Sequence, residues 1–428
     1  MKTSIYNYFI PRGNRYIFFN GITQRFFYVS AENHDRFKDI ISHPENTAYQ
    51  EKYGEFLDRM KVEGFVVDDN VDEMDLIYKD FEKQRYSDQY MLMILPTYRC
   101  NLRCWYCIQE HQDVNLSNDT VERIKKHIGK YLLESGVKRF RLSWFGGEPL
   151  LEYDKIVDIT RFSKNFCEQN NIEFYSDITT NSLLLNHDRI VLLNDLGVKI
   201  YQITIDGCRE RHNKVKISKD NSAFDKAVNN ILDIVKTNPD VSCTLRINYS
   251  DETLEPGKIM HDVNMLIPYE YRKYVRIIPR RIWQIETFPS ELERICELSR
   301  IAKNKHYVIR GVDRGMCYVD YTHFNCIFPN GRVDKCENES LDDTKGFLDE
   351  NGNIIWSSTN LFEKYQVLSE NSDCINCKHL PFCMGPCPQR RNDMAMRYGR
   401  IVCKYPDADS AIEKLIVQYC EENSNVNV

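Results

Sequence analysis

The feature that most constrains the fold of this chain is a repeated alternation of apolar runs and helical segments between residues 91 and 285. The runs are rich in aliphatic, β-branched and aromatic residues, which favour strands. Strands that alternate with helices predict parallel βαβ units in an α/β domain, which we place at residues 90–290. The expected strands span residues 91–95, 140–145, 174–178, 198–205, 242–247 and 275–278.

Three cysteines follow the first of these strands with the spacing C-x3-C-x2-C, at Cys100, Cys104 and Cys107. Three thiolates can bind three irons of a 4Fe–4S cube and leave the fourth iron open to a small molecule. Zinc is the alternative, but a structural zinc site takes four N or S ligands, and only His111 lies near enough in sequence to supply a fourth. The ligand count therefore favours an iron–sulfur cluster.

This stretch resembles the signature of the radical S-adenosylmethionine (SAM) enzymes, including the aromatic residue, here Tyr106, before the third cysteine. The resemblance implies an open, partial (β/α)6 barrel with its chemistry at the C-terminal ends of the strands. It also implies that the cluster donates an electron to SAM. SAM then splits into methionine and a 5′-deoxyadenosyl radical, which takes a hydrogen atom from the substrate.

Later strand ends resemble further segments of the same family. In the family, a Gly-Gly-Glu-Pro edge holds the amine of SAM, and two glycines allow a close approach to the backbone. Arg246 is the expected partner of the SAM carboxylate, because a guanidinium fork suits a carboxylate. Each polar residue alone could be an ordinary solvated strand end, and Ser182 stands where the family has Gly. The residues implied to bind SAM are Tyr106, Gly146, Gly147, Glu148, Thr180, Thr204, Asp206, Arg246 and Asn248.

Seven more cysteines form a second group, with the spacing C-x13-G-x4-C followed by C-x2-C-x5-C-x3-C-x15-C. This pattern resembles the SPASM domain, a C-terminal extension with two auxiliary 4Fe–4S clusters, here at residues 310–410. A zinc ribbon at the four cysteines from 374 to 387 is the alternative, although it would leave three cysteines of the pattern unused. The resemblance assigns Cys374, Cys377, Cys383 and Cys403 to an outer cluster, and Cys317, Cys336 and Cys387 to an inner one. Cys326 could supply an eighth ligand; otherwise one cluster keeps an open iron.

The first 85 residues begin with aromatic runs at residues 6–10, 15–19 and 25–29, separated by turn residues. Such runs predict β-hairpins, and helical patterns follow them. A small sheet followed by helices resembles the winged-helix RiPP recognition element, a peptide-binding domain of many enzymes that modify ribosomally made peptides. The alternative is a cap that shields one end of the next domain. Residues 411–428 are expected to form a C-terminal helix and tail.

Composition excludes several other classes of protein. The net charge of −6 argues against a general nucleic-acid binder, and no apolar run approaches the ~20 residues of a membrane span. The N-terminus lacks the apolar core of a signal peptide, so sixteen cysteines are not expected to form disulfides. We expect a cytoplasmic protein.

The resemblance as a whole implies an enzyme that takes a hydrogen atom from a precursor peptide with a leader segment. It would install a C–C or thioether crosslink, or a related oxidative modification, with flavodoxin or ferredoxin as an electron donor. Glu337 follows Cys336 where one branch of the family has a proposed base, although an exposed loop glutamate explains it somewhat better. Two other functions stay open. They are an anaerobic sulfatase maturase, which makes formylglycine, and a non-catalytic peptide-binding scaffold.

Overall fold

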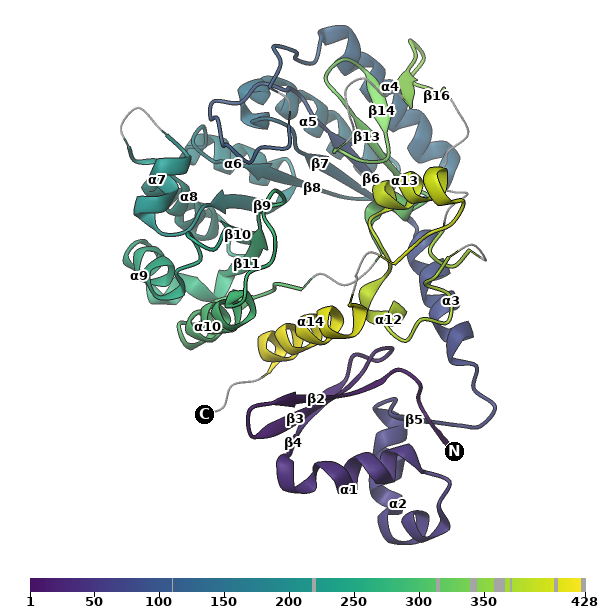
Figure 1. Cartoon of the computed structure of the whole chain (residues 1–428). Helices are drawn as coiled ribbons and strands as arrows, with labels where there is room; N and C mark the ends of the chain where they lie inside the picture. Colours follow the sequence, from purple (N-terminus) through teal and green to yellow (C-terminus); the bar gives the residue numbers. More distant parts are fainter. Residues whose placement is uncertain are drawn as a thin grey trace. The chain divides into compact units, whose positions relative to one another are not determined.

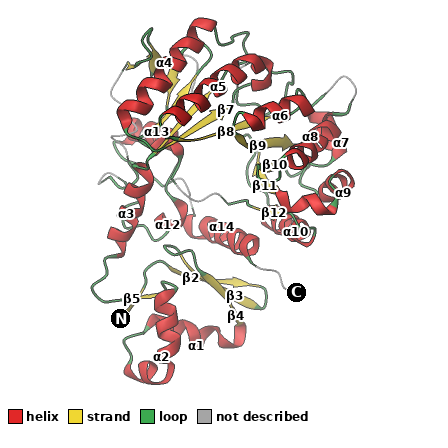
Figure 2. Cartoon of the chain, turned by 180° about the vertical axis from the view of Figure 1, so that it is seen from behind, coloured by secondary structure: helices red, strands yellow, loops and turns green. Residues whose placement is uncertain are grey.

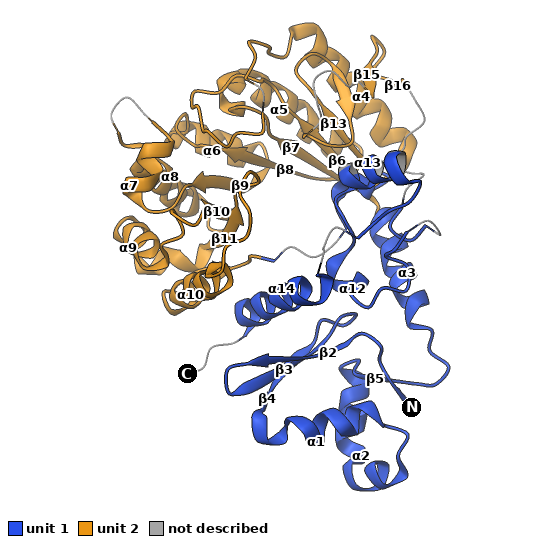
Figure 3. Ribbon diagram, in the orientation of Figure 1, with its two compact units in different colours: residues 1–86, 312–322, 361–424 blue, residues 87–311, 323–360, 425–428 orange. Residues whose placement is uncertain are grey.

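The computed structural model describes residues 1–109, 111–217, 221–312, 316–338, 345–357, 366–369, 372–403 and 407–424 (Figure 1). The chain divides into two compact units (Figure 3). Unit 1 contains residues 1–86, 312–322 and 361–424, and unit 2 contains residues 87–311, 323–360 and 425–428. In the described part of the chain, no helix is both long and apolar enough to cross a membrane.

Unit 2 is built on a parallel sheet that contains all six predicted strands. Each strand is hydrogen-bonded to the next in sequence order, and helices cover one face of the sheet (Figure 2). The strands are β6 (Gln89–Ile94), β7 (Arg139–Trp144), β8 (Glu173–Thr180), β9 (Val198–Ile205), β10 (Ser242–Tyr249) and β11 (Val275–Arg281), with β12 (Val308–Ile309) at the edge. The helices are α4 (Asn118–Ser135), α5 (Tyr153–Gln169), α6 (His187–Asp195), α7 (Arg209–Val215), α8 (Ala223–Thr237), α9 (Pro256–Leu266) and α10 (Glu291–Asn304). The predicted α/β fold is therefore confirmed.

The first crossover shows why these segments form helices. The Ser117 side chain accepts a hydrogen bond from the Thr120 N–H at 3.0 Å and caps the start of α4. Gly136 ends the helix with a φ of +69°, a conformation that glycine adopts without steric cost. Between the caps, Val121, Ile124 and Leu132 turn one buried face toward the sheet.

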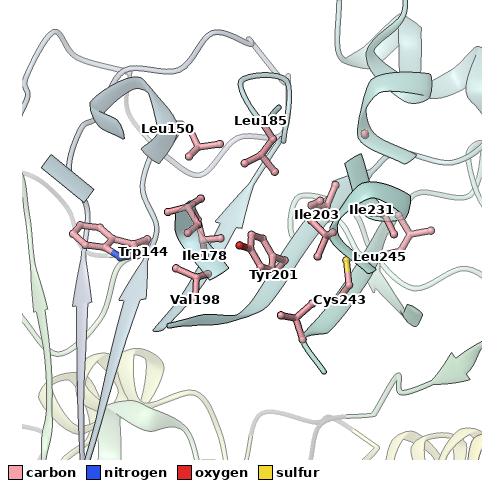
Figure 4. Close-up of a cluster of buried hydrophobic side chains, with 14 of the residues drawn as sticks. Trp144, Leu150, Ile178, Leu185, Val198, Tyr201, Ile203, Ile231, Cys243 and Leu245 are labelled. Carbon is pink, nitrogen blue, oxygen red and sulfur yellow. The ribbon is translucent and has the colours of Figure 1, made fainter. Parts of the chain in front are cut away.

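The core of unit 2 lies between the sheet and its helices. Figure 4 shows Trp144, Ile178 and Tyr201, from three successive strands, side by side in this core. Each of them is at most 1% exposed. The Trp144 indole N–H donates to the Thr160 hydroxyl of α5 at 3.2 Å, so the polar atom of this buried ring is satisfied. The core therefore fixes the strands whose C-terminal ends carry the predicted site.

A hairpin from late in the sequence continues the same sheet. Strand β13 (Phe324–Ile327) pairs in parallel with β6, the first strand of the barrel. It turns at Gly331, which has a φ of +83°, into β14 (Arg332–Asp334). Strands β15 (Gly346–Leu348) and β16 (Ile354–Trp356) extend the sheet further. The positive φ of Gly331 explains the hairpin turn, whereas the pairing with β6 has no local signal in the sequence.

Unit 1 begins with the predicted small antiparallel sheet. Its strands are β2 (Asn7–Arg12), β3 (Arg15–Asn20) and β4 (Phe26–Ser30). Helices α1 (Ala31–Ser42) and α2 (Thr47–Val62) pack on it around Phe18, Ile41 and Leu57, which are fully buried. A short pair, β1 (Lys2–Thr3) with β5 (Val66–Val67), and helix α3 (Glu73–Arg85) complete this region.

The C-terminal cysteine-rich region belongs to the same unit as this sheet. It contains η3 (Tyr318–Asp320), α12 (Leu380–Cys383), α13 (Pro388–Tyr398) and α14 (Ala408–Asn423). Phe19 of β3 packs edge-on against Phe382, with ring centroids 5.3 Å apart. The Tyr8 hydroxyl lies 2.9 Å from Nδ1 of His379 and donates to the Lys378 carbonyl at 3.0 Å. The first 86 residues and the cysteine-rich region therefore share one core.

Candidate active site

The three-cysteine loop leaves the C-terminal end of β6, as the sequence predicts. Cys100 and Cys104 are partly buried, and Cys107 is exposed. The Cys107 N–H donates to the Cys104 carbonyl at 3.0 Å, which closes a turn between these two cysteines. Burial raises the pKa of Cys100 to about 11 and also raises that of Cys104. Thiols with raised pKa values stay protonated unless a metal binds them. Binding to the irons of a cluster would deprotonate them.

Gly147 and Glu148, which follow β7, hold this loop in place through backbone hydrogen bonds. The Glu148 N–H donates to the Arg99 carbonyl at 2.8 Å, and the Gly147 N–H donates to the Thr97 carbonyl at 3.1 Å. A Cβ atom at Gly147 would overlap the Arg99 carbonyl, one residue before the first cysteine. We expected Gly146 and Gly147 to make room for a ligand, and at Gly147 the space is taken by the backbone of the cysteine loop.

Glu148 is fully buried and links the ends of β7 and β8 through hydrogen bonds. Its carboxylate accepts hydrogen bonds from the Thr180 hydroxyl at 2.7 Å, the Asn181 N–H at 2.9 Å and the Leu150 N–H at 3.1 Å. Burial raises the pKa of Glu148, and these three donors act in the opposite direction. The structure therefore brings the predicted residues Glu148 and Thr180 into direct contact.

Tyr106 connects the cysteine loop to the next two strand ends. Its hydroxyl donates to the carboxylate of Asp206, which follows β9. The Asn248 side-chain amide donates to the same hydroxyl at 3.1 Å, and Arg246 Nε donates to Asn248 Oδ1 at 2.9 Å. Burial, with the neighbouring Asp206, raises the pKa of Tyr106. Four predicted residues thus form one hydrogen-bonded chain across the barrel edge.

A buried lysine beside this chain was missed in the sequence. The Lys216 side chain is 5% exposed and lies at the end of α7, with Nζ 3.3 Å from an Asp206 carboxylate oxygen. Nζ also donates to the carbonyl of the predicted residue Thr204 at 2.7 Å. Its charge counteracts the raised pKa values of Cys104 and Glu148, so it places positive charge at the predicted cluster and SAM site. A lysine ten residues after Asp206 gives no periodic signal, and only the fold reveals it.

Known proteins resemble this chain over the region that carries the site. A family model described as the radical SAM superfamily matches residues 94–263. Residues 94–263 therefore belong to the radical SAM superfamily. A GTP 3′,8-cyclase of Clostridium perfringens (strain SM101 / Type A) is 35% identical over 122 residues. That match covers 28% of this chain and 35% of the cyclase, so the chain spans about a third of the length of these curated relatives.

Two other similarities extend over nearly the whole chain. The radical SAM cyclopropyl synthase TigE of Paramaledivibacter caminithermalis is 22% identical and covers 90% of this chain and 86% of its own length. The crystal structure of Streptococcus suis SuiB bound to the precursor peptide SuiA has 14% identity and a TM-score of 0.53. It covers 95% of this chain and 99% of SuiB, so the two folds match along their lengths.

The second cysteine group of the chain lies mainly in unit 1. The four cysteines predicted to hold the outer cluster, Cys374, Cys377, Cys383 and Cys403, line one pocket together with His379. Among the described residues, no three Cys, His, Asp or Glu side chains stand close enough to bind a single metal ion. In a cube each thiolate binds its own iron, so the ligands surround a volume larger than one ion.

The predicted inner-cluster residues are distributed over both units. Cys317 and Cys387 belong to unit 1, whereas Cys336 and the eighth-ligand candidate Cys326 belong to unit 2, as does the predicted base Glu337. Cys326 is fully buried in β13 opposite Asp334, and burial raises the pKa of its thiol. The Glu337 carbonyl accepts a hydrogen bond from the Gln109 side chain at 3.3 Å, which links Glu337 to the SAM-cluster loop. The ligand roles of these cysteines and the role of Glu337 as a base stay predictions.

Proposed function

We propose that this radical SAM enzyme modifies a ribosomally synthesised precursor peptide. The modification would be a C–C or thioether crosslink or a related oxidative change. One observation carries the proposal: the fold matches SuiB, which was solved with its precursor peptide, over 95% of this chain. The similarity to TigE supports it, because that protein is a radical SAM cyclopropyl synthase.

The barrel residues would bind and orient SAM. Cys100, Cys104 and Cys107 would hold a 4Fe–4S cluster, because three free thiols follow one strand end and the buried Lys216 charge acts on Cys104. When bound and reduced, this cluster supplies the electron that splits SAM into methionine and a 5′-deoxyadenosyl radical. The Gly146–Glu148 edge would face the SAM amine. Arg246 would bind the SAM carboxylate through its guanidinium fork.

The cysteine-rich region would hold two auxiliary clusters. The pocket lined by Cys374, Cys377, Cys383 and Cys403 fits the outer one, since four thiols line a single pocket. A substrate radical that closes into a crosslink must lose one electron, and clusters in this region would accept it. Glu337 would act as the base that takes the proton released in that step.

The front sheet would contact the leader segment of the peptide. Strands β2, β3 and β4 share unit 1 with the outer-cluster cysteines. The Tyr8–His379 contact connects the two regions directly. A leader bound to this sheet would therefore contact the same unit whose outer cluster would accept the electron from the substrate radical. A reductant such as flavodoxin or ferredoxin would supply the electron for SAM.

The test is a reaction with a candidate peptide encoded by a short reading frame next to this gene. Anaerobically reconstituted protein is expected to contain about twelve irons, from three cubes. With SAM and dithionite, it should produce 5′-deoxyadenosine and a peptide two hydrogens lighter. Deuterium from a labelled peptide should appear in the 5′-deoxyadenosine. An aldehyde at a Cys or Ser of a sulfatase peptide would instead indicate the sulfatase maturase function and refute the proposal.

A further inference from the structure

Unit 1 contains a buried arginine that contacts the chain segments of two predicted inner-cluster ligands. Arg391 lies in α13, one helical turn after Cys387, and its backbone N–H donates to the Cys387 carbonyl at 2.9 Å. Its guanidinium Nη2 donates to the Asp320 carboxylate. The Asp320 N–H in turn donates to the Cys317 carbonyl at 2.9 Å. The ion pair therefore joins the segments that carry Cys317 and Cys387.

The guanidinium of Arg391 has buried N–H donors that do not hydrogen-bond to Asp320. The residue is 1% exposed, and it is among the largest fully buried side chains of the protein. Within the described residues, its Nε and Nη1 atoms have no hydrogen-bond partner. A buried charged donor without an acceptor is strongly unfavourable, so this position calls for an acceptor beside Cys317 and Cys387.

An iron–sulfur cluster has the chemistry of that acceptor. Its thiolate and sulfide sulfurs carry negative charge and accept hydrogen bonds, which tune its reduction potential. We propose that Arg391 donates Nε–H and Nη1–H to the auxiliary cluster held by Cys317 and Cys387 and raises the reduction potential of that cluster. The inference rests on the proposed function, because it requires an auxiliary cluster at these cysteines.

The two members of the ion pair act on the cluster in opposite directions. Donors and positive charge stabilise the reduced cluster, which is the more negative state, whereas the Asp320 carboxylate destabilises it. A purely structural ion pair makes a different prediction, because loss of either member would then only weaken the link between the two segments. The sign of the change in potential therefore separates the two roles.

The test uses the full chain with Cys100, Cys104 and Cys107 changed to Ala, so that only auxiliary clusters remain. Iron is measured first, and potentials are then obtained by redox titration followed by electron paramagnetic resonance. Arg391→Lys keeps the charge and the ion pair but loses the planar fork of donors. Asp320→Asn keeps an acceptor for Nη2 and removes the negative charge. We expect one cluster to shift to a more negative potential in R391K and to a more positive one in D320N.

Arg139→Lys is the matched control, because Arg139 at the start of β7 pairs with Asp88 at 2.7 Å in a pair whose arginine is 44% exposed. Its potentials should equal those of the parent. A parent that retains no iron would refute the auxiliary clusters and this inference with them. A parent with about eight irons and no shifts, or shifts of the same sign, would overturn only the role of Arg391. Loss of about four irons in both variants would also overturn the role of Arg391. If only one variant loses iron, the sign of the potential shift in the other variant decides.

Discussion

Gly147→Ala tests whether the second strand end holds the SAM-cluster loop. A Cβ atom at this position would overlap the Arg99 carbonyl, which belongs to backbone rather than to a side chain that can rotate away. Overpacking of this kind costs about 1–3 kcal/mol. The shift would also weaken the Glu148–Arg99 backbone hydrogen bond, whose net contribution is about 1 kcal/mol. We therefore expect a loss of about 2–4 kcal/mol in unfolding free energy.

The assay combines urea unfolding with the iron content of the reconstituted protein. Gly257→Ala is the control, because a Cβ atom there meets nothing within 4 Å in helix α9. It should leave the iron content unchanged and stabilise the protein by about 0.5–1 kcal/mol, as expected for Ala in a helix. In G147A we expect displaced cysteines and a loss of roughly four irons. Wild-type stability with full iron content would refute the reasoning.

Three further results are expected. His127 is buried, accepts from the Tyr90 hydroxyl, and burial lowers its pKa to about 4, so protonation favours the unfolded state. The contribution of His127 to the unfolding free energy should thus be fully present above pH 6.5 and fall by about 2 kcal/mol by pH 5. Equal shifts of the urea midpoint with pH in wild type and His127→Asn would contradict this. Cys374→Ala with Cys377→Ala should leave 5′-deoxyadenosine formation intact and sharply reduce crosslinked peptide; a wild-type ratio of the two products would exclude the outer cluster as electron acceptor. Tyr8→Phe removes a hydroxyl bound to Lys378 and His379 and should cost about 1 kcal/mol; an unchanged urea midpoint would show that this link contributes nothing.

The sequence predicts those parts of the structure that depend on local pattern. The apolar runs gave all six barrel strands, because a buried parallel strand is a short continuous apolar segment. The cysteine loop and the hairpin turn at Gly331 also have local signals, namely fixed spacing and a residue that tolerates positive φ. Tyr106 and Glu148 could be placed from their motifs, and the structure brings both into contact with other predicted residues.

Long-range pairing is what the sequence could not predict. No local pattern in residues 324–327 indicates that they pair with β6, which lies more than two hundred residues earlier. Lys216 becomes a buried cation only because α7 folds back onto Asp206. The shared core of Phe19 and Phe382 depends on contacts between opposite ends of the chain, and neither segment has a periodicity that identifies its partner.

The pairing of β13 with β6 has a consequence for how the protein is made. Until the ribosome has added residues 324–327, β6 is an unprotected edge with a row of open backbone donors and acceptors. Strand β6 therefore gains its second neighbour only after more than two hundred further residues have been synthesised. During that interval an apolar edge is open to pairing with another chain. Synthesis thus exposes the strand that leads into the SAM-cluster loop for longer than any other strand of the parallel sheet.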